Sequence, residues 1–109
     1  MKRINPHTLT IEEDTDNKKY VYVLSESGCW DYEHTLSVEV FENFESALTA
    51  FEQAILDSRT EMRDWLDDDN IEDNKMIDEE NSHASYEIYQ RGDFSRLHDC
   101  LVVVKKEVK

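Results

Sequence analysis

The chain of 109 residues carries 26 Asp and Glu against 12 Lys and Arg, which gives a formal net charge of −14. Its apolar fraction of 39%, with two Trp, five Tyr and four Phe, excludes a disordered acidic chain. The length predicts one domain, 1–109, and no apolar run approaches the ~20 residues of a membrane span. The negative charge argues against direct binding to nucleic acid, because phosphate contacts require Lys and Arg.

The beginning of the chain shows no export signal, because no apolar segment follows its basic residues. Two widely spaced cysteines, Cys29 and Cys100, are typical of reduced thiols. We therefore expect a cytoplasmic protein, either of a bacterium or of a phage that acts inside its host. Residues 1–17 are expected to form an N-terminal arm, in which 8–11 suit either a short strand or a short capped helix.

Two strands are predicted after this arm. Residues 18–26 contain the run Tyr-Val-Tyr-Val-Leu, whose side chains favour an extended conformation. Gly28 follows in a turn-forming sequence, where we expect a positive φ. In residues 33–41 apolar and polar residues alternate, so one face of the strand is apolar. The apolar residues on that face are Leu36, Val38 and Val40. The two strands are predicted to pair as an antiparallel hairpin.

The clearest predicted element is a helix that begins after Asn43, a favourable N-cap, with Glu45 in its first turn. Its apolar residues recur every three or four positions and form one stripe. We expect this stripe to pack on the face that carries Val38 and Val40. At ~1.5 Å per residue the helix is roughly 35 Å long, so its second half is expected to overhang the sheet. The stripe consists of Phe44, Ala47, Leu48, Phe51, Ala54, Ile55, Met62, Trp65 and Leu66.

The rest of the chain is predicted to form an acidic loop, 67–82, and a second hairpin. Its strands are 83–91 and 96–104 or beyond, separated by a turn at Gly92. The apolar run at the end of the last strand indicates a central strand covered on both faces. The order predicts an α+β domain with a two-layer ββαββ fold. Its antiparallel sheet has four strands, or five with the N-terminal strand, and one long amphipathic helix covers one face. The other face meets water or a partner.

A calcium site is one interpretation of the acidic segment. Asp73 occupies the position where an EF-hand loop needs Gly, and Lys75 a position that is usually apolar. An acid-rich segment matches the remaining positions by chance, so we expect a solvated loop without calcium. The four residues at EF-hand ligand positions are Asp68, Asn70, Glu72 and Glu79.

A thiol or metal site at His98 and Cys100 is a second interpretation, because residues two apart in a strand share a face. No second pair of ligands accompanies them, and a cysteine in an apolar strand is typical of a protein core. The chain also contains no catalytic motif. We therefore expect no metal, no cofactor and no enzymatic activity.

Acidic residues of the helix form the most suggestive pattern. Their spacing of four, three and four places them in one row, ~5–6 Å apart along the axis. Phosphate charges on DNA are spaced on a similar scale. The row can therefore compete for the Lys and Arg of a nucleic-acid-binding protein, although an ordinary solvated helix face is the alternative. The row is Asp57, Glu61, Asp64 and Asp68, and the expected interface adds Asp67, Asp69, Glu72, Asp73 and Trp30. Trp30 is either an exposed anchor or folds back over the sheet.

The run Tyr-Val-Tyr-Val-Leu at 20–24 and the run Val-Phe-Glu-Asn-Phe-Glu-Ser-Ala at 40–47, which leads into a helix with Phe51, resemble small acidic orphan proteins of phages and mobile elements. The resemblance covers roughly the first two thirds of the chain. Some proteins of that group, the anti-CRISPR and other anti-defence proteins, are strongly acidic and block nucleic-acid sites. The resemblance therefore implies an inhibitor.

These observations together predict a non-catalytic protein that presents an acidic surface to a basic, nucleic-acid-binding partner. An immunity protein or antitoxin that neutralises a basic nuclease toxin would rely on the same physical interaction. A small metal-dependent hydrolase is the alternative from another functional class.

Overall fold

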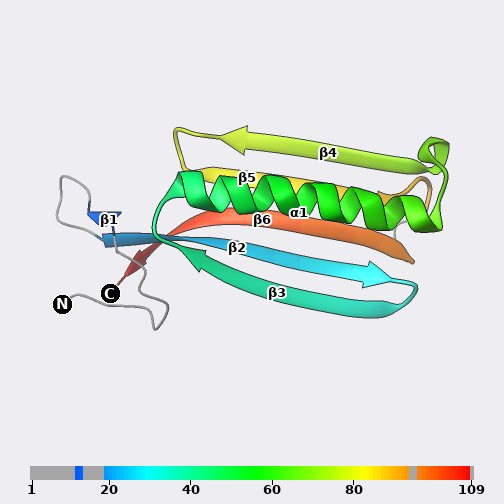
Figure 1. Ribbon diagram of the computed structural model, residues 1–109, viewed down its shortest axis with the longest axis horizontal. Coiled ribbons are helices and arrows are strands. Elements are labelled where there is room, and N and C mark those ends of the chain that lie inside the picture. The colour runs from blue at the N-terminus through cyan, green and yellow to red at the C-terminus, as the bar shows by residue number, and fades with distance from the viewer. Residues whose placement is uncertain (1–11, 14–18, 94–95, 109) are drawn as a thin grey trace.

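One helix lies across one face of an antiparallel sheet in the computed structural model of the protein (Figure 1). The structure describes residues 12–13, 19–93 and 96–108. The sheet contains six strands, of which β1 (Glu12–Glu13) has only two residues. This arrangement confirms the predicted two-layer α+β class with one long helix. The short strand or helix predicted for 8–11 lies outside the described residues.

The helix connects the two outer strands of the sheet. The longer elements follow the chain as β2 (Lys19–Trp30), β3 (Glu33–Phe41), α1 (Phe44–Trp65), β4 (Ile71–Asp78), β5 (His83–Gln90) and β6 (Leu97–Val108). The order across the sheet is β3-β2-β6-β5-β4, with β1 beside β3 on the same edge of β2. α1 therefore takes the chain from one edge to the other, and it packs on β6, β2 and β5 between them.

The core lies between α1 and the three central strands. Asn43 caps the helix as predicted, because its Oδ1 accepts a hydrogen bond from the Ser46 N–H at 2.8 Å. Met62 is fully buried near the end of α1, so the second half of the helix packs on the sheet and does not overhang it. The core residues are Tyr22, Leu24, Ala47, Phe51, Ile55, Met62, Ala84, Tyr86, Ile88, Leu97, Leu101 and Val103.

The first hairpin turns later than the sequence predicts. Gly28 lies inside β2, and the positive φ values are at Asp31 and Tyr32, 56° and 72°, which form the turn. Gly28 is instead a point of close approach, because a Cβ there would lie 2.8 Å from Asp99 Oδ1. The prediction of a turn at Gly28 is wrong for this reason: the glycine makes room for a side chain from the neighbouring strand.

The apolar side of β3 faces away from α1, which corrects the predicted packing of Val38 and Val40 against the helix. Leu24, a core residue that faces α1, pairs directly with Glu39. Because side chains alternate along a strand, Val38 lies on the opposite face of the sheet, where 59% of its surface is exposed. Leu36 shares that face and is 77% exposed. Among the described residues no helix has both the length and the apolar character that crossing a membrane requires.

β4 corrects the prediction of an acidic loop over 67–82. A short 3₁₀ turn, Asp68–Asn70, leads into β4, which pairs with β5 along its whole length. β4 is an edge strand, so its charged side chains remain in water while its backbone pairs with β5. The second half of the fold is therefore a helix followed by three strands in the order β4, β5 and β6.

Candidate functional site

Three acids of the predicted row share one flank of α1. Asp57, Glu61 and Asp64 are all exposed, and their spacing keeps them on one side of the helix. The negative charge of Asp57 helps to raise the pKa of Glu26 on β2, so this flank lies on the side of α1 next to β2 and β3. We call these three residues the acidic flank. The predicted continuation of the row to Asp68 is wrong, because α1 ends at Trp65 and the chain then changes direction.

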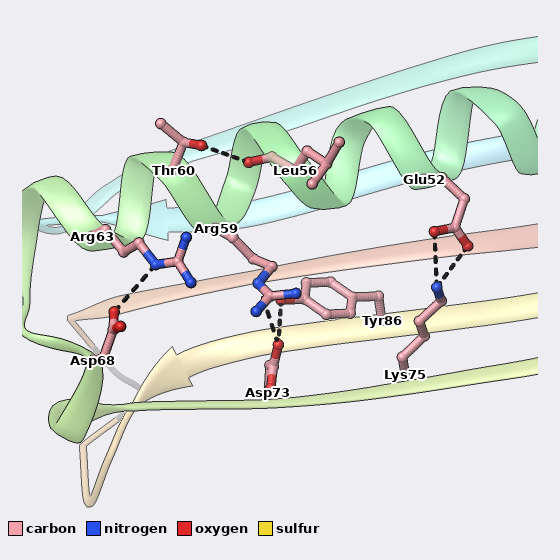
Figure 2. Close-up of polar contacts among 9 residues, drawn as sticks. All are labelled: Glu52, Leu56, Arg59, Thr60, Arg63, Asp68, Asp73, Lys75 and Tyr86. Atoms are coloured by element: carbon pink, nitrogen blue, oxygen red, sulfur yellow. Dashed lines mark hydrogen bonds and ion pairs between the residues drawn. The ribbon is translucent and has the colours of Figure 1, made fainter.

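The opposite flank of α1 carries the positive charge. Arg59 Nε lies 3.8 Å from Asp73 Oδ2, and Arg63 Nε lies 3.1 Å from Asp68 Oδ1. Figure 2 shows Arg59 directed toward Asp73 on β4 and Arg63 toward Asp68 in the turn before it.

Lys75 completes this arrangement from the β4 side. Its Nζ lies 2.7 Å from Glu52 Oε1, across the space between α1 and β4 (Figure 2). This space is a shallow hollow of about 370 Å³, whose walls include Leu56, Arg59 and Tyr86. All the basic residues between positions 26 and 87 therefore lie in or beside this hollow, where each is within ion-pair distance of a carboxylate.

Two further acids of the predicted interface, Asp73 and Glu72, accept hydrogen bonds from tyrosines of the neighbouring strand β5. Asp73 Oδ2 accepts a hydrogen bond from Tyr86 Oη at 2.9 Å, and burial followed by this bond raises the pKa of Tyr86. Glu72 accepts a hydrogen bond from Tyr89 Oη at 3.1 Å, which raises the pKa of that tyrosine. Glu72 also pairs with Arg91 at 3.2 Å. Because neighbouring residues of a strand point to opposite faces, β4 does not present Glu72 and Asp73 together.

The remaining predicted interface residues lie at the same end of the molecule. Asp67 and Asp69 are exposed around the 3₁₀ turn after α1. Trp30 ends β2 and is half-buried against the core, so it folds over the sheet and is not a freely exposed anchor. Nearby, Arg96 lies 5.8 Å from the centre of the Trp65 ring, a cation–π contact.

A buried acidic cluster is the main feature that the sequence did not predict. Asp99 on β6 is 1% exposed, and its Oδ2 accepts a hydrogen bond from Ser58 Oγ of α1 at 2.7 Å. Glu26 on β2 is half-buried and lies within hydrogen-bonding reach of Asp99. Burial first, then hydrogen bonding with Asp99 and the charges of Asp99 and Asp57, raise the pKa of Glu26 from 4.5 to about 8. The sequence offered one sign of this cluster. Glu26, Ser58 and Asp99 are polar residues at core-facing positions of β2, α1 and β6.

The metal-ligand patterns do not assemble into a site. The four EF-hand positions span a 3₁₀ turn, an extended strand and the turn after it, so they do not form a calcium loop. On the sheet face away from α1, Cys29 lies opposite His34 and His98 in the strand register. Burial raises the pKa of the Cys100 thiol on that face. Among the described residues, no group of three His, Cys, Asp or Glu side chains could hold a metal ion.

Two groups of acidic residues therefore stand out among the described residues. One is the exposed acidic flank of α1, and the other is Glu26 with the buried Asp99. No family model, no curated protein and no solved structure matches this chain.

Proposed function

We propose that the protein is a non-catalytic inhibitor or regulator that binds a basic, nucleic-acid-binding partner through the acidic flank of α1. The segregation of charge across the helix carries this proposal. Arg59, Arg63 and Lys75 are held on the β4 side of α1. Arg96, which contacts Trp65 at the end of the helix, is paired with Asp31. Asp57, Glu61 and Asp64 have no ion pair with any described residue. This flank therefore retains its negative charge for a partner.

The adjoining sheet surface adds to this charge. Glu33 and Glu39 on β3 are exposed and, by the strand register, lie on the side of the sheet that faces α1. The helix contributes a rigid row with carboxylates ~5–6 Å apart along its axis. Such an arrangement attracts a basic surface from a distance and competes with phosphate for the same Lys and Arg side chains. Anti-defence inhibition of a nucleic-acid-binding protein is the corresponding biological role.

A competition assay tests this function. Basic DNA-binding proteins and nucleases are loaded with fluorescent duplex DNA, and release of the DNA is followed as this protein is added. We expect release from at least one of them, with an apparent affinity that falls as NaCl rises, because salt screens charge steering. A nuclease toxin in the same panel tests the immunity role, since its preferential inhibition would favour an immunity protein or antitoxin.

Charge-reversal variants identify the surface that is responsible. The double variant Asp57→Lys and Asp64→Lys should weaken the competition at least tenfold, equivalent to ~1.4 kcal/mol. The control variant Glu79→Lys and Glu80→Lys has the same change in charge but lies in the exposed turn between β4 and β5. It should remain close to wild type. Equal competition by both variants would contradict the assignment of the interface to the acidic flank.

A further inference from the structure

A buried polar contact links the middle of α1 to the sheet. Asp99 projects from β6 toward the helix, and Ser58 of α1 donates a hydrogen bond to its Oδ2 at 2.7 Å. The backbone N–H of Cys100 donates to Oδ1 at 3.1 Å. Both side-chain oxygens of Asp99 therefore accept a hydrogen bond. Because Asp99 is almost fully buried, its hydrogen bond to Ser58 helps to position α1 on the sheet.

Glu26 brings a second carboxyl group into this contact from β2. Asp99 lies two residues before Leu101, the register partner of Glu26, so the two carboxyl groups share one face of the paired strands. Ionised carboxylates are acceptors only, so a hydrogen bond between them requires a proton on one of the two. Both oxygens of Asp99 already accept from Ser58 and Cys100, and Glu26 is the member of the pair whose pKa is raised. Burial and the neighbouring negative charges act in the same direction and raise the pKa of Glu26 to about 8.

The surroundings of the pair contain no compensating cation among the described residues that face it. Arg59, the nearest Arg of α1 in sequence, lies on the other flank and reaches Asp73. Gly28 leaves the space in which the Asp99 carboxylate sits, since a Cβ there would be 2.8 Å from its Oδ1. The groups around the pair are Asp57 and Ser58 from α1, Gly28 and Trp30 from β2, Thr35 and Ser37 from β3, and Tyr86 and Ile88 from β5.

We propose that Glu26 and Asp99 share one proton and form a pH-sensitive latch that holds the middle of α1 against the sheet. With the proton present, the pair is a hydrogen-bonded unit that Ser58 ties to the helix. Without it, two neighbouring carboxylates repel each other, and the burial of Asp99 weakens the screening of this repulsion by water. The latch works in the protein alone and requires no partner.

The direction of the pH effect follows from proton linkage. The folded protein binds the Glu26 proton more tightly than the unfolded chain, where the pKa is near the usual 4.5. The stabilisation is therefore complete below about pH 4.5 and is lost progressively as pH rises to about 8. Above that range both states are ionised, and this contribution no longer changes with pH.

Urea unfolding between pH 4.5 and 9 tests the latch. Glu26→Gln keeps a donor for Asp99 but cannot ionise, so its stability should fall less with pH than that of wild type. The difference in slope should approach one proton per molecule, and at pH 9 the variant should be the more stable protein. Glu39→Gln is the matched control on exposed β3 and should follow wild type. Identical pH profiles for wild type and Glu26→Gln would overturn the proposal.

Two measurements on the wild-type protein keep the test decisive if the variant fails to fold. In a carbon NMR titration of the side-chain carboxyl groups, one member of the pair should titrate above pH 7. Titration of both below pH 5 would overturn the shared proton. Hydrogen exchange should show α1 amides around Ser58 losing protection from pH 6 to 8.5 before the strands do. A uniform loss across the molecule would overturn the latch.

Discussion

Gly28 matters to this fold because of the space that it leaves. Its backbone is extended, so no special φ value requires a glycine there. The position that a Cβ would occupy lies 2.8 Å from Asp99 Oδ1, 3.1 Å from Thr35 Oγ1 and 3.1 Å from Trp30 Nε1. Three polar side chains from different strands thus converge over one residue of β2. The absence of a side chain at Gly28 leaves room for the buried Asp99 carboxylate.

Replacement of Gly28 by Ala should therefore be destabilising even though Ala suits a strand better than Gly. We expect a loss of roughly 1–3 kcal/mol, because the new methyl group must displace the Asp99 carboxylate or the backbone. The free energy of unfolding in urea gives the measurement. Ser27→Ala, at the exposed neighbouring position, is the control and should change stability by less than ~0.5 kcal/mol. A neutral Gly28→Ala would show that the cluster adapts readily.

The buried acidic cluster illustrates which part of the site a sequence can reveal. The acidic flank follows from local spacing on one helix, so residues such as Asp57 and Asp64 can be assigned without a structure. Glu26 and Asp99 are far apart in the chain and meet only because β2 pairs with β6. Strand order is a tertiary property that local periodicity does not contain. Ser58 in an apolar stripe was a hint, but it did not identify its partner.

α1 forms one of the two layers, and the stripe of apolar residues along it identifies the face that packs on the sheet. Phe51 is fully buried at the centre of that stripe, whereas Leu56 is 59% exposed beside the hollow on the β4 side. Phe51→Ala should reduce the free energy of unfolding by roughly 3–5 kcal/mol, because a large cavity remains. Leu56→Ala should lose less than ~1 kcal/mol. Comparable losses in urea unfolding would contradict the observed helix face.

The strands show where sequence periodicity reaches its limit. Alternation in β3 correctly places Leu36 and Val38 on one face, but it does not say which face the helix covers. That depends on the register with β2, which pairs Leu24 with Glu39. β4 was missed for a related reason, because an edge strand needs no apolar face of its own when a neighbour supplies the backbone pairing.

Across the whole molecule, the fold separates acidic residues that have ion-pair partners from acidic residues that have none among the described residues. The side of α1 next to β4 contains Arg59, Arg63 and Lys75, all with acidic partners. On the side of the acidic flank, the described residues pair Arg96 with Asp31 before β3, whereas Asp57, Glu61 and Asp64 have no ion pair with a described residue. The same flank includes Asp57, which contributes to the raised pKa of Glu26. The surface proposed to bind a partner is therefore electrostatically connected to the buried pair.

This connection predicts that partner binding is linked to protons. A Lys or Arg docked on Asp57 would offset the negative charge that helps to keep Glu26 protonated, so the pKa of Glu26 should fall in the complex. Binding should then release up to one proton between about pH 6 and 8, and affinity should rise with pH over that range. Titration calorimetry in two buffers with different ionisation enthalpies counts the released protons directly.

The variant Glu26→Gln separates this linkage from the interface itself. It retains the exposed carboxylates of the acidic flank, so it should bind the partner and release no proton from this pair. Asp57→Asn should reduce both the affinity and the proton release, because it removes the charge through which the partner acts on Glu26. Strong binding by wild type without proton release would show that the buried pair does not sense the partner. Unchanged binding by Asp57→Asn would instead place the partner elsewhere on the molecule.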